Sequence, residues 1–194
     1  MSGTAPAIPF QLDDFLNWEA EQPLRHEFVE GETFAMTGGT DIHNEISLNA
    51  AFQLRAYAKG KPCRVYMADV KLAVEADDAC FYPDDFLTCS PADAERNLVK
   101  QDALLIVEVL SPNTEAYDRG KKFSHYRRID SLQAYVLIVQ DESRIEAFVR
   151  TPDNHWTLFE ASGRDASLRI PLAEDTLDLP LAAIYQDIAG IESA

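Results

Sequence analysis

The chain has 194 residues, of which 46% are hydrophobic and 26% charged, so it is long enough and apolar enough to bury a hydrophobic core. Its 17 basic and 33 acidic side chains give a net charge of −16, and such a surface repels nucleic acid unless a local basic patch or a bound metal offsets it. No apolar run approaches the roughly 20 residues that a membrane-spanning helix needs. The N-terminal MSGTAPAIPFQLDDF lacks the basic and apolar regions of a signal peptide, so we expect no membrane partner.

The cysteines Cys63, Cys80 and Cys89 are odd in number and form no CxxC pair. This pattern predicts neither a disulfide framework nor a zinc site. It favours a reducing compartment, and we therefore expect a cytoplasmic protein.

The N-terminal part of the chain predicts two helices separated by a hairpin. Residues 1–9 are expected to form a loose tail, and residues 11–22 a short helix that stops before a proline. The alternation in RHEFVEGETFAM, with Glu30-Gly31 at its centre, predicts a β-hairpin. Asp41 is then expected to cap a helix over residues 42–57, which Gly60 can end.

Beyond this helix the hydrophobic period becomes strand-like. RVYMADVKLAVEA predicts two strands with a break near Asp69, and DDACFYPDDFLTC predicts a strand with a Pro-Asp turn. LLIVEVL is a continuous apolar run, as expected for a central strand covered on both faces. A helix over residues 117–128, the buried strand AYVLIV, a hairpin of RIEAFVR and HWTLFEA, and a short C-terminal helix come next. This order predicts an α/β or α+β fold with a mixed central sheet.

One charge stands inside the most apolar of these strands. Glu108 interrupts LLIVEVL, while Asp84 lies upstream in YPDDF and Lys122 downstream in DRGKKF. Two acids delivered by neighbouring strands can converge, and two carboxylates with backbone carbonyls and waters suit Mg²⁺ or Mn²⁺. Such a metal polarises a phosphoryl oxygen and lowers the pKa of a bound water, and a nearby lysine can orient that water.

The same carboxylate has a simpler interpretation. A carboxylate at the end of a strand can cap a helix or pair with an arginine, and Arg119 or Arg127 could neutralise Glu108. A buried charge requires a partner, but that partner need not be a metal. The spacing alone leaves both interpretations open.

Taken in order, YPDDF, IVEVLSPNT, DRGKKFSHY and the AYVLIV strand resemble the restriction-endonuclease-like family within the PD-(D/E)XK nuclease superfamily. HEFVEGETFAM and the start of the following helix also resemble the N-terminal half of that family, so the resemblance covers roughly residues 27–139. It implies a restriction-endonuclease-like core, with a mixed central sheet flanked by helices and an N-terminal hairpin. We expect one domain over residues 1–194, with a flexible tail at 1–9 and a core at roughly 24–160.

The resemblance also implies a set of site residues. Asp84 matches the aspartate of the PD element and Glu108 the acid of the ExK element, and both would ligate Mg²⁺ or Mn²⁺ together with the backbone carbonyl of Val109. The sequence departs from the pattern at Leu110, where ExK would place lysine. In this family the lysine stands on the following helix, where Lys122 matches it.

Several neighbouring positions stay ambiguous. Successive helical residues point about 100° apart, so only one of Lys121 and Lys122 can reach the site, and the match favours Lys122. Neighbouring strand residues face opposite sides, so Asp85 is expected to face away if Asp84 faces the metal. By the resemblance three further residues are candidates to line the cleft: Glu30, His43 and Arg119. Glu30 can equally be a turn residue, His43 a polar cap, and Arg119 the partner of Asp118 or Glu115.

The resemblance implies a Mg²⁺-dependent endonuclease that hydrolyses phosphodiester bonds of DNA through Asp84, Glu108 and Lys122. The alternative is a nuclease-like module that no longer cleaves and serves in binding or assembly, which the charge of −16 favours. A small-molecule hydrolase has less support, because the chain contains no GxSxG, HExxH or GxxxxGK motif. Cutting both strands of a duplex usually needs two sites, so the resemblance also implies a homodimer.

Overall fold

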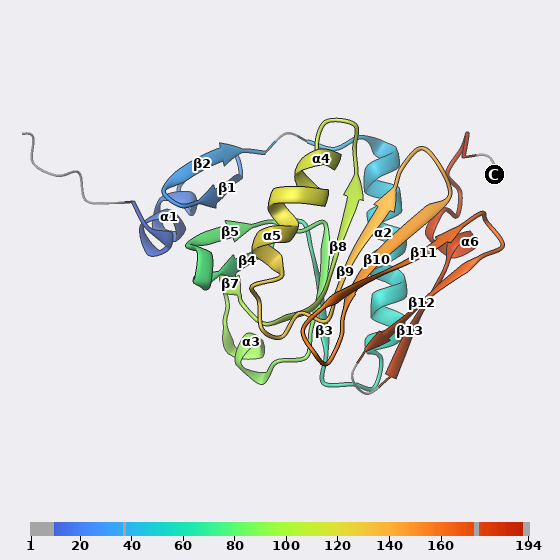
Figure 1. Ribbon diagram of the computed structural model, residues 1–194. Helices are drawn as coiled ribbons and strands as arrows, with labels where there is room; N and C mark the ends of the chain where they lie inside the picture. Colours follow the sequence, from blue (N-terminus) through green and yellow to red (C-terminus); the bar gives the residue numbers. More distant parts are fainter. Residues whose placement is uncertain (1–9, 37, 173–174, 192–194) are drawn as a thin grey trace, which may run out of the picture.

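The computed structural model describes residues 10–36, 38–172 and 175–191, and the tail expected at residues 1–9 lies outside them. A six-stranded sheet with the order β11-β10-β9-β8-β6-β3 forms the centre of the fold (Figure 1). Its strands are β3 (Arg64–Met67), β6 (Asp85–Thr88), β8 (Ala103–Leu110), β9 (Ala134–Val139), β10 (Arg144–Arg150) and β11 (Trp156–Ser162). The β8–β9 pair is parallel and the other pairs are antiparallel, so the predicted mixed central sheet is confirmed.

A second sheet has the order β2-β1-β5-β4-β7 and lies toward the N-terminal end of the molecule (Figure 1). Its strands are β1 (His26–Val29), β2 (Glu32–Ala35), β4 (Lys71–Val74), β5 (Ala79–Phe81) and β7 (Val99–Lys100). The first two form the predicted hairpin around Glu30-Gly31. Both glycine and glutamate there have positive φ, of 91° and 50°, which a two-residue hairpin loop favours. The break expected near Asp69 separates β3 from β4.

Helices cover both faces of the six-stranded sheet. The long helix α2 (Asp41–Ala58) packs on one face, and α4 (Glu115–Tyr117), the π-helical turn Asp118–Lys122 and α5 (Phe123–Tyr126) pack on the other (Figure 1). Shorter helical segments are α1 (Leu12–Glu19), a 3₁₀ turn (Glu75–Asp77), α3 (Pro91–Glu95) and α6 (Leu181–Ile184). No described helix is both long and apolar enough to cross a membrane.

The faces of β8 divide the core in two. Leu105, Val107 and Val109 pack toward α2, with β12 (Ser167–Leu172) and β13 (Asp175–Pro180) completing that layer. Ile106 and Leu110 point to the opposite side, where Tyr126 of α5 is buried. Since strand side chains alternate, Glu108 belongs to this second face. The hairpin of β12 and β13 precedes the expected C-terminal helix and was not predicted from the sequence.

Two local predictions need correction. The N-cap of α2 is Thr40 and not Asp41, because the Thr40 hydroxyl accepts the His43 amide. The prediction of no disulfide is wrong, because Cys63 and Cys89 are joined. Antiparallel β3 and β6 pair Arg64 with Thr88, so the residues flanking this pair come opposite one another. Cysteines 26 residues apart in the sequence are thus brought together by strand register, and the argument for a reducing compartment loses its basis.

Candidate active site

Glu108 is the central carboxylate of the site. It lies in the interior strand β8, between β6 and β9, and only 3% of its surface is exposed. Its Oε1 is 2.8 Å from the Lys122 ammonium and accepts a hydrogen bond of 2.9 Å from the Tyr126 hydroxyl. Burial raises the pKa of Glu108, opposed by the attraction to Lys122 and assisted by repulsion from Asp84. The charge inside the apolar strand therefore has a protein partner, and that partner is the lysine of DRGKK.

Lys122 reaches the strand from the π-helical turn Asp118–Lys122. Its side chain is buried, whereas the neighbouring Lys121 is exposed, so the structure places Lys122 and not Lys121 beside the carboxylate. The Lys122 ammonium also lies 3.2 Å from Glu27 and 3.8 Å from Asp118. Burial alone lowers the pKa of Lys122, but attraction to these carboxylates outweighs it and the pKa is raised well above its usual value. The ammonium form is thereby retained.

Asp84 lies just before β6, in the turn that follows β5. Its Oδ2 accepts the Val109 amide at 2.7 Å, and its Oδ1 lies 3.0 Å from His43 Nε2. Val109 follows Glu108 directly in β8, so this bond fixes the two acids at adjoining points of one sheet. The hydrogen bond to Asp84 raises the pKa of His43, against the opposing effect of burial. His43 thus orients the predicted metal-binding aspartate from the first turn of α2.

The side chain of Asp85 lies in an environment different from those of Asp84 and Glu108. Its side chain is fully buried, and Oδ2 accepts a hydrogen bond of 3.2 Å from Ser47 of α2. Oδ1 has no partner among the described atoms. Burial, and then repulsion from Asp84, raise the pKa of Asp85 well above its usual value. Because Asp84 precedes the strand, strict alternation does not apply, and both carboxylates contact α2, one turn apart.

Two of the three candidate cleft residues lie elsewhere. Glu30 is at the hairpin turn, where its amide donates to the Asp78 carbonyl, and it lines a surface hollow with Phe10 and Gln11. The backbone φ of Glu30 is 50°, in the left-handed region that a tight hairpin turn uses. Glu30 is therefore a turn residue, which was one of the alternatives considered from the sequence.

Arg119 is engaged by two carboxylates. Its guanidinium contacts Glu146 of β10 at 2.5 and 3.0 Å and Glu115 at 2.7 Å. Pairing with Glu115 was one of the sequence-based alternatives, and the bidentate bond to Glu146 explains why the arginine is drawn toward β10. Its charge is therefore neutralised within the protein and is not directed at Glu108.

Sequence reasoning missed three groups that surround Lys122. Glu27 of β1 contributes Oε1, which also lies 3.5 Å from the Tyr82 amide. Tyr126 contributes its hydroxyl, and Asp118 a buried carboxylate. A signal for Glu27 existed, because the alternation of HEFVEGE puts Glu27 and Phe28 on opposite faces of a strand. It did not reveal that the second sheet presents this glutamate to the ammonium.

The donor set determines which cofactor the site can accept. Within the described residues, no three His, Cys, Asp or Glu side chains are arranged to hold a metal ion. Asp84 accepts one bond at each oxygen, and an ionised carboxylate offers about four acceptor positions, so capacity remains. Two carboxylates with the balance made up by water and substrate oxygens match the way Mg²⁺ is usually bound in phosphoryl-transfer sites. The carboxylate oxygens of Asp84 and Glu108 are donors of the kind that Mg²⁺ or Mn²⁺ prefers.

The sequence matches the model of the Uma2 family, described as "Putative restriction endonuclease", over residues 12–182. This chain belongs to the Uma2 family. The match includes every residue of the candidate site, from Glu27 to Tyr126. Family membership and fold together support a nuclease function, and the resemblance drawn from YPDDF and IVEVLSPNT is confirmed.

Relatives of this Uma2 protein include two uncharacterized proteins of Synechocystis sp.. The protein slr1290 is 31% identical over 192 residues, covering 97% of this chain and 100% of the relative. The protein sll1609 is 28% identical over 157 residues, covering 80% and 89%. The crystal structure of a putative nuclease belonging to DUF820 from Anabaena variabilis superposes with a TM-score of 0.70, at 19% identity, and covers 91% of this chain and 98% of that one. This structural likeness confirms the restriction-endonuclease-like fold.

Proposed function

We propose that this Uma2 protein is a Mg²⁺- or Mn²⁺-dependent endonuclease that hydrolyses phosphodiester bonds of DNA. The observation that carries the proposal is the convergence of one lysine with two acids, one within β8 and one just before the neighbouring strand β6. Asp84 is tied to the Val109 amide at 2.7 Å, and Glu108 is 2.8 Å from the Lys122 ammonium. Replacing a buried ion pair such as Glu108–Lys122 by apolar residues is often neutral or stabilising, so stability alone does not account for the presence of these charges.

The protein groups have separate tasks in this proposal. Asp84 and Glu108, with the Val109 carbonyl, would hold the cation, which when bound polarises a phosphoryl oxygen and lowers the pKa of water. Lys122 keeps its proton, because its pKa is raised, so it donates hydrogen bonds and offsets negative charge that develops on the phosphate. His43 holds the Asp84 carboxylate in position.

The alternative, a module that binds or assembles without cleaving, has one observation in its favour. Glu108 is 3% exposed and already neutralised by Lys122, so the protein satisfies this charge internally. In that case the buried ion pair would be a remnant with a structural role. The two proposals differ in whether a divalent cation binds.

Cleavage of a supercoiled plasmid and of a linear duplex, with millimolar Mg²⁺ or Mn²⁺, tests the first proposal. We expect Glu108→Gln and Asp84→Asn to lower the rate by about a hundredfold or more while the far-ultraviolet circular dichroism stays unchanged. Asp69→Asn is the matched control, because that carboxylate is 82% exposed and its ion pair among the described residues is with Arg25 at the surface. Equal cleavage by wild type and Glu108→Gln would overturn the assignment.

Titration calorimetry separates the alternative. A cleaving enzyme should bind Mn²⁺ at millimolar concentration and lose that binding in Glu108→Gln. If neither cation binds, with or without duplex DNA, and no cleavage is seen, the protein is a silent module.

A further inference from the structure

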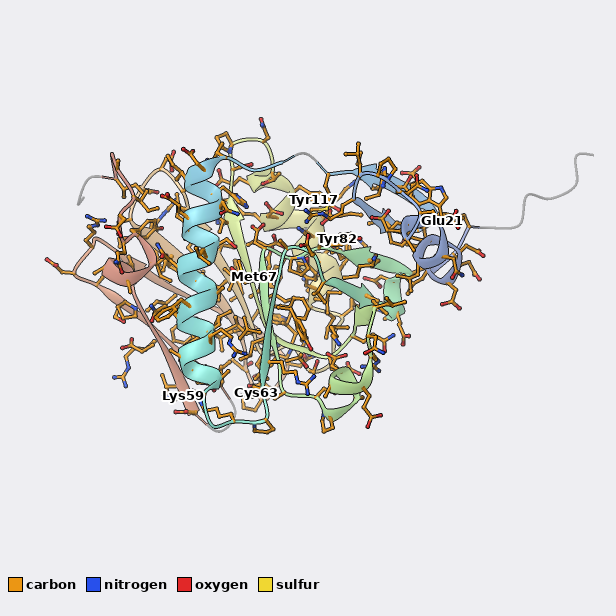
Figure 2. The ribbon with its side chains drawn as sticks, turned by 180° about the vertical axis from the view of Figure 1, so that it is seen from behind. Glu21, Lys59, Cys63, Met67, Tyr82 and Tyr117 are labelled. Atoms are coloured by element: carbon orange, nitrogen blue, oxygen red, sulfur yellow. A yellow bond between two sulfur atoms is a disulfide. The ribbon has the colours of Figure 1, made fainter. Side chains whose placement is uncertain are left out.

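The outer face of α2 is a straight exposed stripe that nothing in the described structure covers. Residues at positions 45, 48, 52 and 55 are spaced three, four and three apart, which keeps them on one side of a helix. Leu48 is 57% exposed and Phe52 70% exposed. The stripe lies opposite the buried face formed by Ile46, Ala50 and Leu54. Seen from behind, α2 stands in front of the sheet, and no helix or strand is drawn over it (Figure 2).

Charges of opposite sign stand at the two ends of this stripe. An acid, Glu45, precedes the two apolar residues, and a base, Arg55, follows them. The ends repeat the pattern, with Asp41 in the first turn and Lys59 at the C-cap, which Figure 2 labels at the end of α2. The pairs 41/59, 45/55 and 48/52 are all centred on position 50. No described side chain forms an ion pair with either Glu45 or Arg55, so both charges are available to a partner.

We propose that this stripe is a self-association surface, on which α2 of a second copy packs antiparallel about a two-fold axis at position 50. A two-fold interface is self-complementary, so a contact from residue i to residue j is repeated from j to i. In this arrangement Leu48 meets the partner's Phe52, and Glu45 meets the partner's Arg55. The same helix in a parallel pair would place acid against acid and base against base. Charge order therefore selects both the partner, a second copy, and its direction.

The geometry has a consequence for the candidate sites. His43 sits on the inner side of the same helix, where it binds Asp84. With a rise of 1.5 Å per residue, the two copies of position 43 lie about 21 Å apart along the paired helices. The dimer would thus carry its two sites at opposite ends of one interface. The interface itself does not depend on whether those sites cleave DNA.

Sedimentation velocity of the full chain between about 1 and 100 µM tests the surface. We expect wild type to sediment as a dimer of the 21.7 kDa chain. Phe52→Asp should raise the dimer dissociation constant about thirtyfold or more, because it puts a charge at the centre of the contact. Leu98→Asp is the matched control, since Leu98 is 79% exposed and directly precedes β7, at the edge of the other sheet. It should leave the assembly unchanged.

A charge exchange tests the direction of packing. Glu45→Arg and Arg55→Glu should each weaken the dimer, and the double variant should restore it, because every repelling pair becomes an attracting one again. A monomeric wild type at 100 µM would overturn the proposal, and so would a dimer that Phe52→Asp does not weaken. Failure of the double variant to recover would overturn the antiparallel arrangement. Circular dichroism of each variant verifies that α2 is still folded.

Discussion

The Lys122 ammonium lies 2.8 Å from Oε1 of Glu108, and both side chains are almost completely removed from water. The lysine comes from a helical turn and the glutamate from the middle of a sheet, so this pair joins the two layers of the fold. A carboxylate buried at such depth without a cation would carry a large free-energy penalty. The pair consequently affects stability as well as the proposed chemistry.

Replacing Lys122 by methionine should destabilise the protein by about 3–5 kcal/mol, because Glu108, Glu27 and Asp118 would lose their shared cation. Urea denaturation at pH 7 measures the loss. Lys121→Met is the matched control, and its effect should stay within about 0.5 kcal/mol because that side chain is exposed. Equal effects of the two substitutions would contradict the placement of the buried cation.

His43→Ala should reduce DNA cleavage by about ten- to a hundredfold, since the Asp84 carboxylate would lose the imidazole 3.0 Å from its Oδ1. Initial rates at saturating Mg²⁺ are the measurement. His155→Ala should cleave like wild type, because that imidazole is 79% exposed and pairs with Asp153. Unchanged cleavage by His43→Ala would show that the Val109 amide alone suffices to hold Asp84.

Asp85→Asn should stabilise the protein, and the gain should increase with pH. The folded state raises the pKa of Asp85, so it holds a proton that the unfolded chain releases above its ordinary pKa near 4. Wild-type stability therefore falls as pH rises through this window, whereas the asparagine variant does not titrate. The difference should grow by about 1.4 kcal/mol per pH unit until the raised pKa is passed. Urea denaturation with EDTA at several pH values checks the slope, and a constant difference would contradict it.

Thiol counting checks the cysteine assignment. Burial raises the pKa of the Cys80 thiol to about 12, so the folded protein should not react with a thiol reagent at pH 8. Protein purified without reductant should show one thiol in denaturant, and three after reduction. Three thiols before reduction would mean that Cys63 and Cys89 are not joined.

The disulfide should also contribute to stability. Joining residues 26 apart restricts the unfolded chain, and loop-closure entropy predicts a loss of about 3–4 kcal/mol when Cys63 and Cys89 are both replaced by serine. Urea denaturation measures this loss. Reduced wild type should match the double variant, and an oxidised wild type no more stable than the variant would contradict the prediction.

Much of the central sheet could be predicted because the hydrophobic pattern within each strand indicates a strand. The continuous run around Glu108 is buried on both faces, and AYVLIV becomes the parallel strand β9 beside it. The hairpins around Gly31 and between β10 and β11 follow from alternation and turn residues. These features depend on neighbours in sequence, which a single chain displays directly.

Other features depend on the register between distant segments, which local pattern does not encode. The Cys63–Cys89 bond requires β3 to pair with β6, and the Glu27–Lys122 contact requires one sheet to meet the helical layer of the other. Leu110, where the nuclease pattern would place lysine, shows the same limit of prediction from the sequence. Its apolar side chain is buried in the core, so the strand has no room there for an ammonium group, and only the three-dimensional structure shows where the cation enters.

The Lys122 ammonium and the Glu108 carboxylate are attached to backbone of two different kinds. Lys122 belongs to the π-helical turn Asp118–Lys122, and Glu108 belongs to the strand β8. Amides of β8 are bonded to β6 and β9 on both sides, whereas the turn is bonded within its own helical segment. Rewinding a π turn into an α turn shifts the downstream helical residues by one position, or about 100° around the axis. Such a shift would move the Lys122 ammonium relative to the Glu108 carboxylate, which β8 holds in place. Slow amide exchange in β8 beside faster exchange in the turn would be the signature of a rigid acidic frame with an adjustable cation.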